Sequence, residues 1–172
     1  MEIRRLGPTD YDGFYALRLA GLEEYPFAFA TNAQAWRAAS RETIERLLTT
    51  SHERGDMPIL GAWVDGHLVG KVGLNRDLRP TVAHKGTLWG FYVSNGYRQQ
   101  GIGTKLLTEM LSLAQATPDL RQIRAVVNVK SDTAVRLLTK AGFEQYGREP
   151  DAKKLDGALY DQIYFWYRLV GE

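Results

Sequence analysis

The chain has 172 residues, enough for one globular domain with its own core, and we expect residues 1–172 to form a single domain. The net charge of +2 and the scattered basic residues indicate no nucleic-acid partner. The absence of cysteine excludes disulfides, a thiol nucleophile and cysteine metal sites. No signal-peptide pattern and no bilayer-length apolar run are found, which predicts a cytoplasmic protein without a membrane partner.

The first third of the chain predicts one strand and two helices. Residues 2–7 are expected to form a strand, followed by a helix that Thr9 or Asp10 caps and that runs to about Glu24. The aromatic segment PFAFATNAQAW has no regular period and is predicted to be irregular. A second helix is expected over residues 40–54, with a serine as its cap.

The middle of the chain predicts three strands. The segments ILGAWV and HLVGKVGL are expected to pair around a tight turn at Asp65 and Gly66. A third strand is predicted over residues 86–93, and it contains Gly90. A glycine inside a strand often indicates a bulge or a close backbone approach.

The last third predicts two helices that alternate with strands. An amphipathic helix follows Gly103, the strand QIRAVVNV comes next, and Ser131 or Asp132 begins a helix that stops at Gly142. The strands FEQYGRE and ALYDQIYFWYRLV then close the chain around a charged loop. This order of about seven strands and about four helices predicts an α/β (α+β) domain with helices on both faces of one sheet.

The segment VSNGYRQQGIGTKLL places Gly101 and Gly103 where a strand passes into a helix. An ordinary structural turn is one interpretation. The dinucleotide-binding fingerprint is absent because Leu106 stands where it needs a third glycine, and the G-K-[ST] of a P-loop is absent as well. Unpaired N–H groups at a helix start attract anions, glycines let the anion approach the backbone, and Arg98 adds charge. These features favour a pyrophosphate held by backbone amides.

The same segment resembles the acetyl-coenzyme A loop of the GNAT superfamily of N-acetyltransferases, whose signature is [QR]-x-x-G-x-[GA]. Arg98 to Gly103 matches it completely, and SDTAVRLLTKAGFEQYGRE resembles the next helix and strand of that family. The resemblance covers essentially the whole chain. It implies the GNAT fold, a mixed and mostly antiparallel sheet splayed between its fourth and fifth strands, with acetyl-CoA as the acyl donor.

The resemblance also implies where acetyl-CoA would bind. Its pantetheine arm would lie along the fourth strand, and a bulge at Gly90 would direct a backbone N–H toward the thioester carbonyl. The pyrophosphate would lie at the glycine loop. The expected cofactor-binding residues are Phe91, Tyr92, Val93, Arg98, Gln99, Gln100, Gly101, Ile102, Gly103, Thr104, Ser131 and Ala134.

Two positions depart from the family pattern. Ser131 stands at the family's asparagine, and Leu138 stands at the tyrosine that often protonates the leaving thiolate. Leu138 cannot do so, and its place on an apolar stripe indicates a packing role. Solvent, Ser131 or a nearby tyrosine would then supply the proton. The same departure leaves a non-catalytic acyl-CoA sensor as an alternative function.

The general base and the acceptor site are less constrained by the sequence. Glu24, His84 and Asp161 are candidates for removing a proton from the amine, although a solvated surface group is the more common explanation of such residues. The three histidines lack metal-ligand spacing, so no metal is expected. An acceptor pocket is predicted from aromatic residues that could instead be core, namely Tyr25, Phe27, Phe29 and Tyr160.

The sequence therefore predicts an acetyl-CoA-dependent N-acetyltransferase whose acceptor is a small-molecule primary amine that attacks the thioester directly in a ternary complex. The alternative enzyme acts on a protein N-terminus or a lysine, as a ribosomal-protein modifier does. The aromatic run YFWY in the last strand would suit either a homodimer surface or the core.

Overall fold

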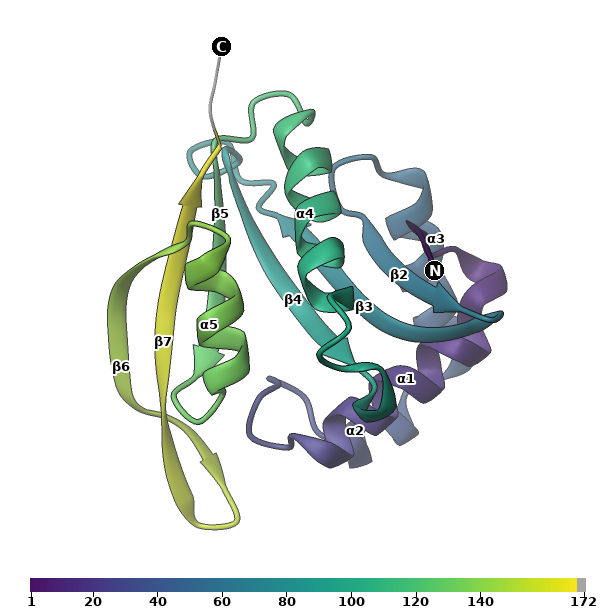
Figure 1. The fold of residues 1–172 in the computed structure, drawn as a ribbon, viewed down its shortest axis with the longest axis horizontal. Coiled ribbons are helices and arrows are strands. Elements are labelled where there is room, and N and C mark those ends of the chain that lie inside the picture. Colours follow the sequence, from purple (N-terminus) through teal and green to yellow (C-terminus); the bar gives the residue numbers. More distant parts are fainter. Residues whose placement is uncertain (170–172) are drawn as a thin grey trace.

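The computed structural model describes residues 1–169, which form one seven-stranded sheet flanked by helices (Figure 1). The strand order across the sheet is β1-β2-β3-β4-β5-β7-β6. The strands are β1 (Glu2–Arg5), β2 (Ile59–Val64), β3 (His67–Arg76), β4 (Lys85–Val93), β5 (Gln122–Asn128), β6 (Glu144–Leu155) and β7 (Ala158–Arg168).

Helices cover both faces of this sheet, as the sequence predicts (Figure 1). Within residues 1–169 the α-helices are α1 (Tyr11–Glu24), α2 (Ala33–Ala38), α3 (Arg41–Glu53), α4 (Ile102–Gln115) and α5 (Asp132–Lys140). Helices α4 and α5 lie on one face, and α1, α2 and α3 lie on the other. Short 3₁₀ turns at Pro8–Asp10 and Asn95–Tyr97 precede α1 and α4.

The sheet opens between β4 and β5, which confirms the expected splay. All other neighbouring strands pair antiparallel, whereas β4 and β5 run parallel and pair only where Lys85–Thr87 meets Gln122–Arg124. Beyond Thr87 the two strands separate, so each has a backbone edge without a neighbouring strand. This gap lies at the centre of the sheet, where the first four strands meet the last three.

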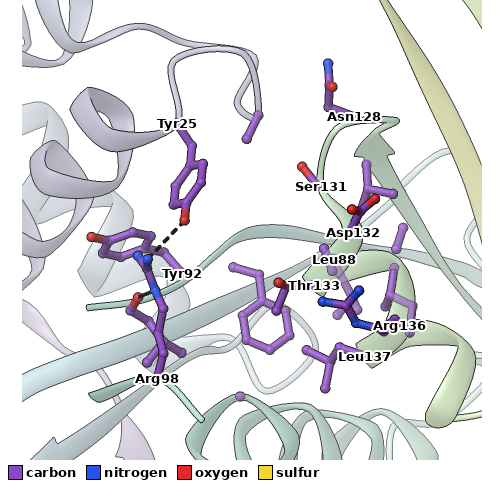
Figure 2. A pocket seen from close by; sticks show the side chains of 18 of the residues that line it. Tyr25, Leu88, Tyr92, Arg98, Asn128, Ser131, Asp132, Thr133, Arg136 and Leu137 are labelled. Atoms are coloured by element: carbon purple, nitrogen blue, oxygen red, sulfur yellow. Dashed lines mark hydrogen bonds between the residues drawn. The ribbon is translucent and has the colours of Figure 1, made fainter. Parts of the chain in front are cut away.

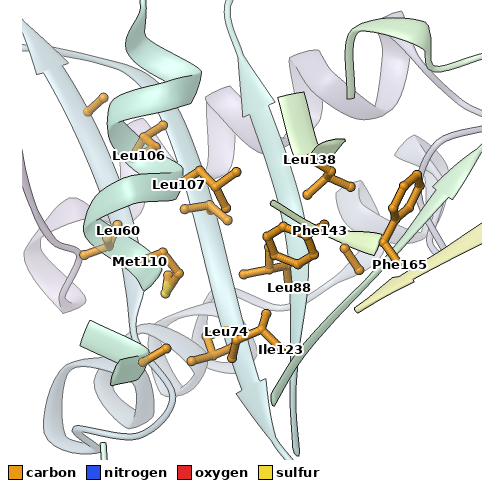
Figure 3. Packing of buried hydrophobic residues seen from close by; sticks show 14 of the residues in the cluster. Leu60, Leu74, Leu88, Leu106, Leu107, Met110, Ile123, Leu138, Phe143 and Phe165 are labelled. Atoms are coloured by element: carbon orange, nitrogen blue, oxygen red, sulfur yellow. The ribbon is translucent and has the colours of Figure 1, made fainter. Parts of the chain in front are cut away.

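Two apolar clusters hold the helices on the sheet. The larger one joins α4 and α5 to the strands and includes Leu106, Leu107 and Met110 of α4 and Leu138 of α5 (Figure 3). The smaller one holds the N-terminal helices on the opposite face and includes Phe14 among its fully buried members. The amphipathic α4 therefore fixes the position of the glycine loop that precedes it.

Two segments differ from the sequence-based expectations. The aromatic segment predicted to be irregular contains α2, whose start is capped by Asn32 accepting from Ala35 N–H at 2.8 Å. The expected charged loop between the last strands is mostly β6, which continues to Leu155 and turns tightly at Asp156 and Gly157. Neither segment has enough alternation or helical period to indicate this.

The ends of the expected elements agree more closely. The first helix ends at Glu24, and Ser40 caps α3 by accepting from Thr43 N–H at 3.2 Å. The first strand is shorter than predicted and ends at Arg5. Val170, which we expected to end the last strand, lies outside the described residues.

Candidate active site

A cleft of about 690 Å³ occupies the gap between β4 and β5. One wall carries Tyr25, Tyr92 and Arg98, and the opposite wall carries Ser131 and the start of α5 (Figure 2). The rest of the lining comes from β4 after Thr87, from β5 after Arg124, from the glycine loop and from the first turn of α4. The gap between β4 and β5 therefore coincides with the segment that the sequence predicts to bind the acyl donor.

The wall formed by β4 contains a bulge at Gly90. Lys71 pairs with Tyr92 and Gly73 pairs with Trp89, so the two intervening residues of β4 oppose a single residue of β3. Gly90 has a φ of +62°, a left-handed conformation that favours glycine. The irregularity expected at this glycine is thus confirmed, and it lies on the lining of the cleft.

The start of α4 presents bare backbone to the cleft. Its N-cap is Gly101, which has a φ of +78° and provides no side-chain cap, and the Lys105 N–H makes the first return bond to the Gly101 carbonyl at 3.0 Å. The amides before Lys105 lack partners inside the helix and lie at the positive end of its dipole. An added Cβ at Gly103 would lie 3.6 Å from Leu137 Cδ2, an ordinary contact. A pyrophosphate fits this geometry because glycine leaves the amides accessible.

Arg98 has a different role from the free charge that the sequence suggests. Its guanidinium donates to both carboxylate oxygens of Glu24, at 2.7 and 2.6 Å, and its Nε donates to the Val93 carbonyl at 2.9 Å. It also donates to the Tyr25 hydroxyl at 2.9 Å (Figure 2). Arg98 therefore ties the glycine loop to β4 and to the end of α1.

The ion pair between Arg98 and Glu24 is accompanied by shifted pKa values at Glu24 and Tyr92. The hydrogen bond from Arg98 lowers the pKa of Glu24, and the Tyr92 hydroxyl adds a second bond to that carboxylate at 2.7 Å. Burial first, and then the bond to Glu24, raise the pKa of Tyr92 to about 12. Glu24 therefore stays ionised and hydrogen-bonded to Arg98 and Tyr92.

None of the three candidate general bases lines the cleft. Glu24 is held by Arg98 behind the wall, and the backbone carbonyl of His84 accepts from the amides that begin β5, at the paired end of the two strands. Asp161 accepts from Arg148 and, at 3.0 Å, from the Asp151 N–H, so it holds a bulge in the last hairpin. These bonds lower the pKa of Asp161, with the Asp151 amide as the larger cause.

The expected cofactor-binding residues gather around the cleft. All of them line it except Gln100, whose side-chain amide donates to the Gly96 carbonyl at 3.2 Å. Ser131 is the N-cap residue of α5, as the sequence predicts, but its side chain makes no capping bond, so its hydroxyl is free of that role. Leu138 is only 3% exposed and belongs to the larger apolar cluster, which confirms its packing role.

The expected acceptor residues divide into two pairs. Tyr25 and Phe29 line the cleft. Phe27 and Tyr160 instead stack on each other, with ring centroids 5.8 Å apart, and Lys153 Nζ donates to the Phe27 carbonyl at 3.3 Å. The last hairpin thus closes against the loop that follows α1.

Sequence reasoning missed Asn128, which lines the cleft at the end of β5. Its side chain is 1% exposed, its Oδ1 accepts from Lys130 N–H at 2.9 Å, and its Nδ2 is buried without a partner. The only signal in the sequence is a polar residue that ends an apolar strand. Among residues 1–169, no group of three acidic or histidine side chains could hold a metal, and no helix is long and apolar enough to cross a membrane.

A sheet splayed beside a bulged strand, with a glycine-started helix at its opening, defines the class of proteins that hold an acyl donor between two strands. Residues 20–143 match the family described as "Acetyltransferase (GNAT) family", and the chain belongs to that family of acyltransferases. The family predicted from the glycine loop is thereby confirmed.

Known proteins are similar to this chain over almost its whole length. The L-amino acid N-acetyltransferase AaaT of Escherichia coli K12 is 25% identical over 162 residues, covering 94% of each chain. The solved acetyltransferase of the GNAT family from Streptococcus pneumoniae has a TM-score of 0.88 at 25% identity, covering 98% of this chain and 99% of that one. A phosphinothricin acetyltransferase from Sinorhizobium meliloti, solved in complex with acetyl-CoA, has a TM-score of 0.82 at 20% identity, covering 98% and 88%.

Proposed function

We propose that this chain transfers the acetyl group of acetyl-CoA to the primary amine of a small molecule. The observation that carries the proposal is the cleft between β4 and β5, with the uncapped start of α4 at its mouth. Membership of the acetyltransferase family and the acetyl-CoA found in the Sinorhizobium meliloti relative support the choice of donor.

The backbone would hold the donor in two places. The amides of the first turn of α4, over Ile102–Thr104, would bind the pyrophosphate because no helical carbonyl accepts from them. The edge of β4 between Leu88 and Val93 would bind the pantetheine amides as an added strand, because β5 has moved away there. Gly103 keeps a side chain from the first of these sites.

The donor would supply a thioester, whose carbonyl carbon the amine attacks. A new C–N bond forms, the C–S bond breaks, and the amine nitrogen loses a proton. A backbone N–H at the Gly90 bulge would stabilise the negative charge that develops on the carbonyl oxygen. Ser131 lines the cleft with an uncommitted hydroxyl and would donate a proton to the departing thiolate, a role that the buried Leu138 cannot take.

The proton of the amine would pass to water in the cleft. Glu24 and Asp161 are held in ion pairs with lowered pKa values, and His84 lies at the paired end of the strands. The rate would then follow the fraction of acceptor present as neutral amine. We expect kcat/KM to rise with pH until the pKa of the acceptor amine is reached.

A small acceptor is favoured by a contact across the acceptor side. The Phe27–Tyr160 stack and the Lys153 bond join the last hairpin to the loop after α1, and this bridge would obstruct an extended peptide. The name of the Escherichia coli relative, an L-amino acid N-acetyltransferase, also favours a small amine. A protein N-terminus or lysine is the alternative acceptor. A non-catalytic acyl-CoA sensor is a second candidate, favoured by Leu138 at the tyrosine position.

The test combines binding with turnover. Acetyl-CoA should raise the melting temperature, and thiol release should appear with part of a panel of small amines. Binding without release for any small amine or peptide would support the sensor, and release only with peptides would support a protein acceptor. No stabilisation by acetyl-CoA would contradict the proposal. A cytoplasmic location and a homodimer stay predictions.

A further inference from the structure

Two cationic side chains meet behind the Gly90 bulge, on the sheet face covered by α1. Lys71 comes from β3 and is 1% exposed, and Arg18 comes from α1 and is half-buried. A Cβ added at Gly90 would lie 2.9 Å from Lys71 Nζ and 3.0 Å from Arg18 Nη1. Both cations therefore lie directly against the bulge at Gly90, which lines the cleft, and neither side chain is itself part of that lining.

Neither cation has an anionic partner in the described part of the chain. Lys71 Nζ donates to the Gly90 carbonyl at 2.5 Å, while Arg18 Nε and Nη1 are buried without any hydrogen-bond partner. Within residues 1–169, no carboxylate forms an ion pair with either side chain. Buried charges are normally paired, so these two depart from the general pattern.

The surroundings of the cations are aromatic. The Arg18 guanidinium lies 5.0 Å from the Trp36 ring centroid and 5.3 Å from that of Trp89, and Lys71 Nζ lies 5.6 Å from that of Phe14. Aromatic faces attract cations but carry no net charge, so two positive charges remain unbalanced. Burial lowers the pKa of Arg18 to about 10, and burial followed by the charge of Arg18 lowers the pKa of Lys71. An anion bound next to Arg18 and Lys71 would instead raise the pKa values of both side chains.

The location matches the acceptor side of the reaction. The Gly90 bulge marks the place where the carbonyl of the donor would be attacked, and Trp89 and Gly90 both line the cleft. The pyrophosphate would lie at the start of α4, which packs on the opposite face of the sheet. A group bound by Arg18 and Lys71 therefore belongs to the acceptor, within a few bonds of its reacting nitrogen.

We propose that Arg18 and Lys71 bind the carboxylate, or an equivalent anionic group, of the acceptor amine. The acceptor class is then a primary amine with an anionic group near the nitrogen, as in an α-amino acid. This inference rests on the proposed acetyl transfer. It explains why a buried guanidinium is left without a partner beside a glycine, where neutral side chains would suffice for packing alone.

The first experiment compares matched acceptors. Several L-amino acids are each assayed against their own carboxamide, with acetyl-CoA saturating and thiol release as the readout. The carboxamide has the less basic amine and supplies more neutral nucleophile at pH 7.5, so chemistry alone favours it. We expect the carboxylate form to have a kcat/KM about 10- to 100-fold higher, as for one or two charge-assisted hydrogen bonds.

The second experiment changes the cations. Arg18→Gln should raise KM for the carboxylate acceptor by about 10-fold or more, while KM for acetyl-CoA and the rates with carboxamides stay nearly constant. Lys71→Met should raise the same KM by a similar factor. Arg18→Lys should restore part of the loss because it keeps the charge. Arg37→Gln is the matched control, since Arg37 pairs with Glu23 at the surface and should leave every constant unchanged.

The outcomes separate this inference from the proposed function. Equal use of carboxylates and carboxamides, or equal losses with both in Arg18→Gln, would overturn the anion site while acetyl transfer stands. If no amine is acetylated, the proposed function fails. Calorimetry, with amino acids titrated into the complex of the protein with coenzyme A, then tests whether Arg18 and Lys71 bind a carboxylate. Carboxylate binding that Arg18→Gln abolishes and Arg37→Gln preserves supports it, and its absence in the wild type overturns it. Lys71→Met repeats the comparison if Arg18→Gln does not fold.

Discussion

The two faces of the opened sheet present positive charge in different ways. On the α4 face, the charge comes from backbone N–H groups at the start of a helix, and Gly101 and Gly103 keep side chains away. On the α1 face, it comes from the buried side chain of Lys71 and the half-buried side chain of Arg18, both next to aromatic rings. Backbone amides are positioned as soon as the helix forms, whereas buried side chains need a surrounding core that destabilises their charge.

The two faces should therefore recognise their ligands through different groups. A donor that is the same in every turnover can be held by backbone, because only shape and dipole are needed. An acceptor that must be distinguished from other amines needs side chains that recognise its own groups. Arg98 belongs to neither group, because its charge is used in an ion pair with Glu24 that joins the glycine loop to the end of α1.

The largest expected effect is at Gly103. Gly103→Val should weaken coenzyme A binding by about 100-fold or more, because branched methyl groups would fill the approach to the helix amides. Gly103→Ala should weaken binding less while raising the free energy of unfolding by about 0.5–1 kcal/mol through helix propensity. Calorimetry with coenzyme A and denaturant unfolding check the two results, and unchanged affinity in Gly103→Val would mean that the amides are not the binding site.

Lys71→Met should stabilise the fold while weakening the use of carboxylate acceptors. Replacing a buried charge with an apolar side chain of similar volume is expected to raise the free energy of unfolding by about 1–4 kcal/mol at pH 7. The lowered pKa of Lys71 sets the sign, because charging it costs more in the folded state. The gain should shrink as pH rises toward the ordinary lysine pKa of about 10.5, where the unfolded chain also loses the charge. A destabilised Lys71→Met would show that the lysine is a structural element instead.

Leu138→Tyr tests whether the family's tyrosine can simply be restored. Leu138 is 3% exposed inside the larger cluster, so a bulkier polar ring should cost about 1–3 kcal/mol of unfolding free energy. We expect no increase in kcat, because Leu138 borders the cleft but is packed in the larger cluster, which leaves no room for a tyrosine to reach the thiolate. A faster enzyme would contradict the assignment of this position to packing, and Leu138→Met provides the volume-matched control.

The smallest effect is expected for the ion pair between Arg98 and Glu24, which joins the glycine loop to the end of α1. Glu24→Gln should lower the free energy of unfolding by about 0.5–1 kcal/mol at pH 7, as for a partly exposed ion pair. Because Arg98 lowers the pKa of Glu24, the contribution is present above the ordinary glutamate pKa and is lost as pH falls through the folded value. The difference between wild type and variant should therefore vanish under acid. A difference that persists there would assign the stability to another contact.

The sequence predicted the donor side well because its signals are local. The glycines at the start of α4, the glycine in β4 and the apolar period of the helices all lie within short segments. Lys71 and Arg18 gave no such signal, since they come from different elements and meet only when α1 packs on β3 and β4. Glu24 appeared to be a free acid for the same reason, because its partner Arg98 lies far along the chain.

The most direct test of the account is a comparison of two Michaelis constants in two variants. The account predicts a crossed pattern, in which Gly103→Ala raises KM for acetyl-CoA and leaves KM for a carboxylate amine unchanged, while Arg18→Gln does the reverse. If both variants change the same constant, or if both change the two constants equally, donor and acceptor are not held on opposite faces of the sheet and the account is wrong.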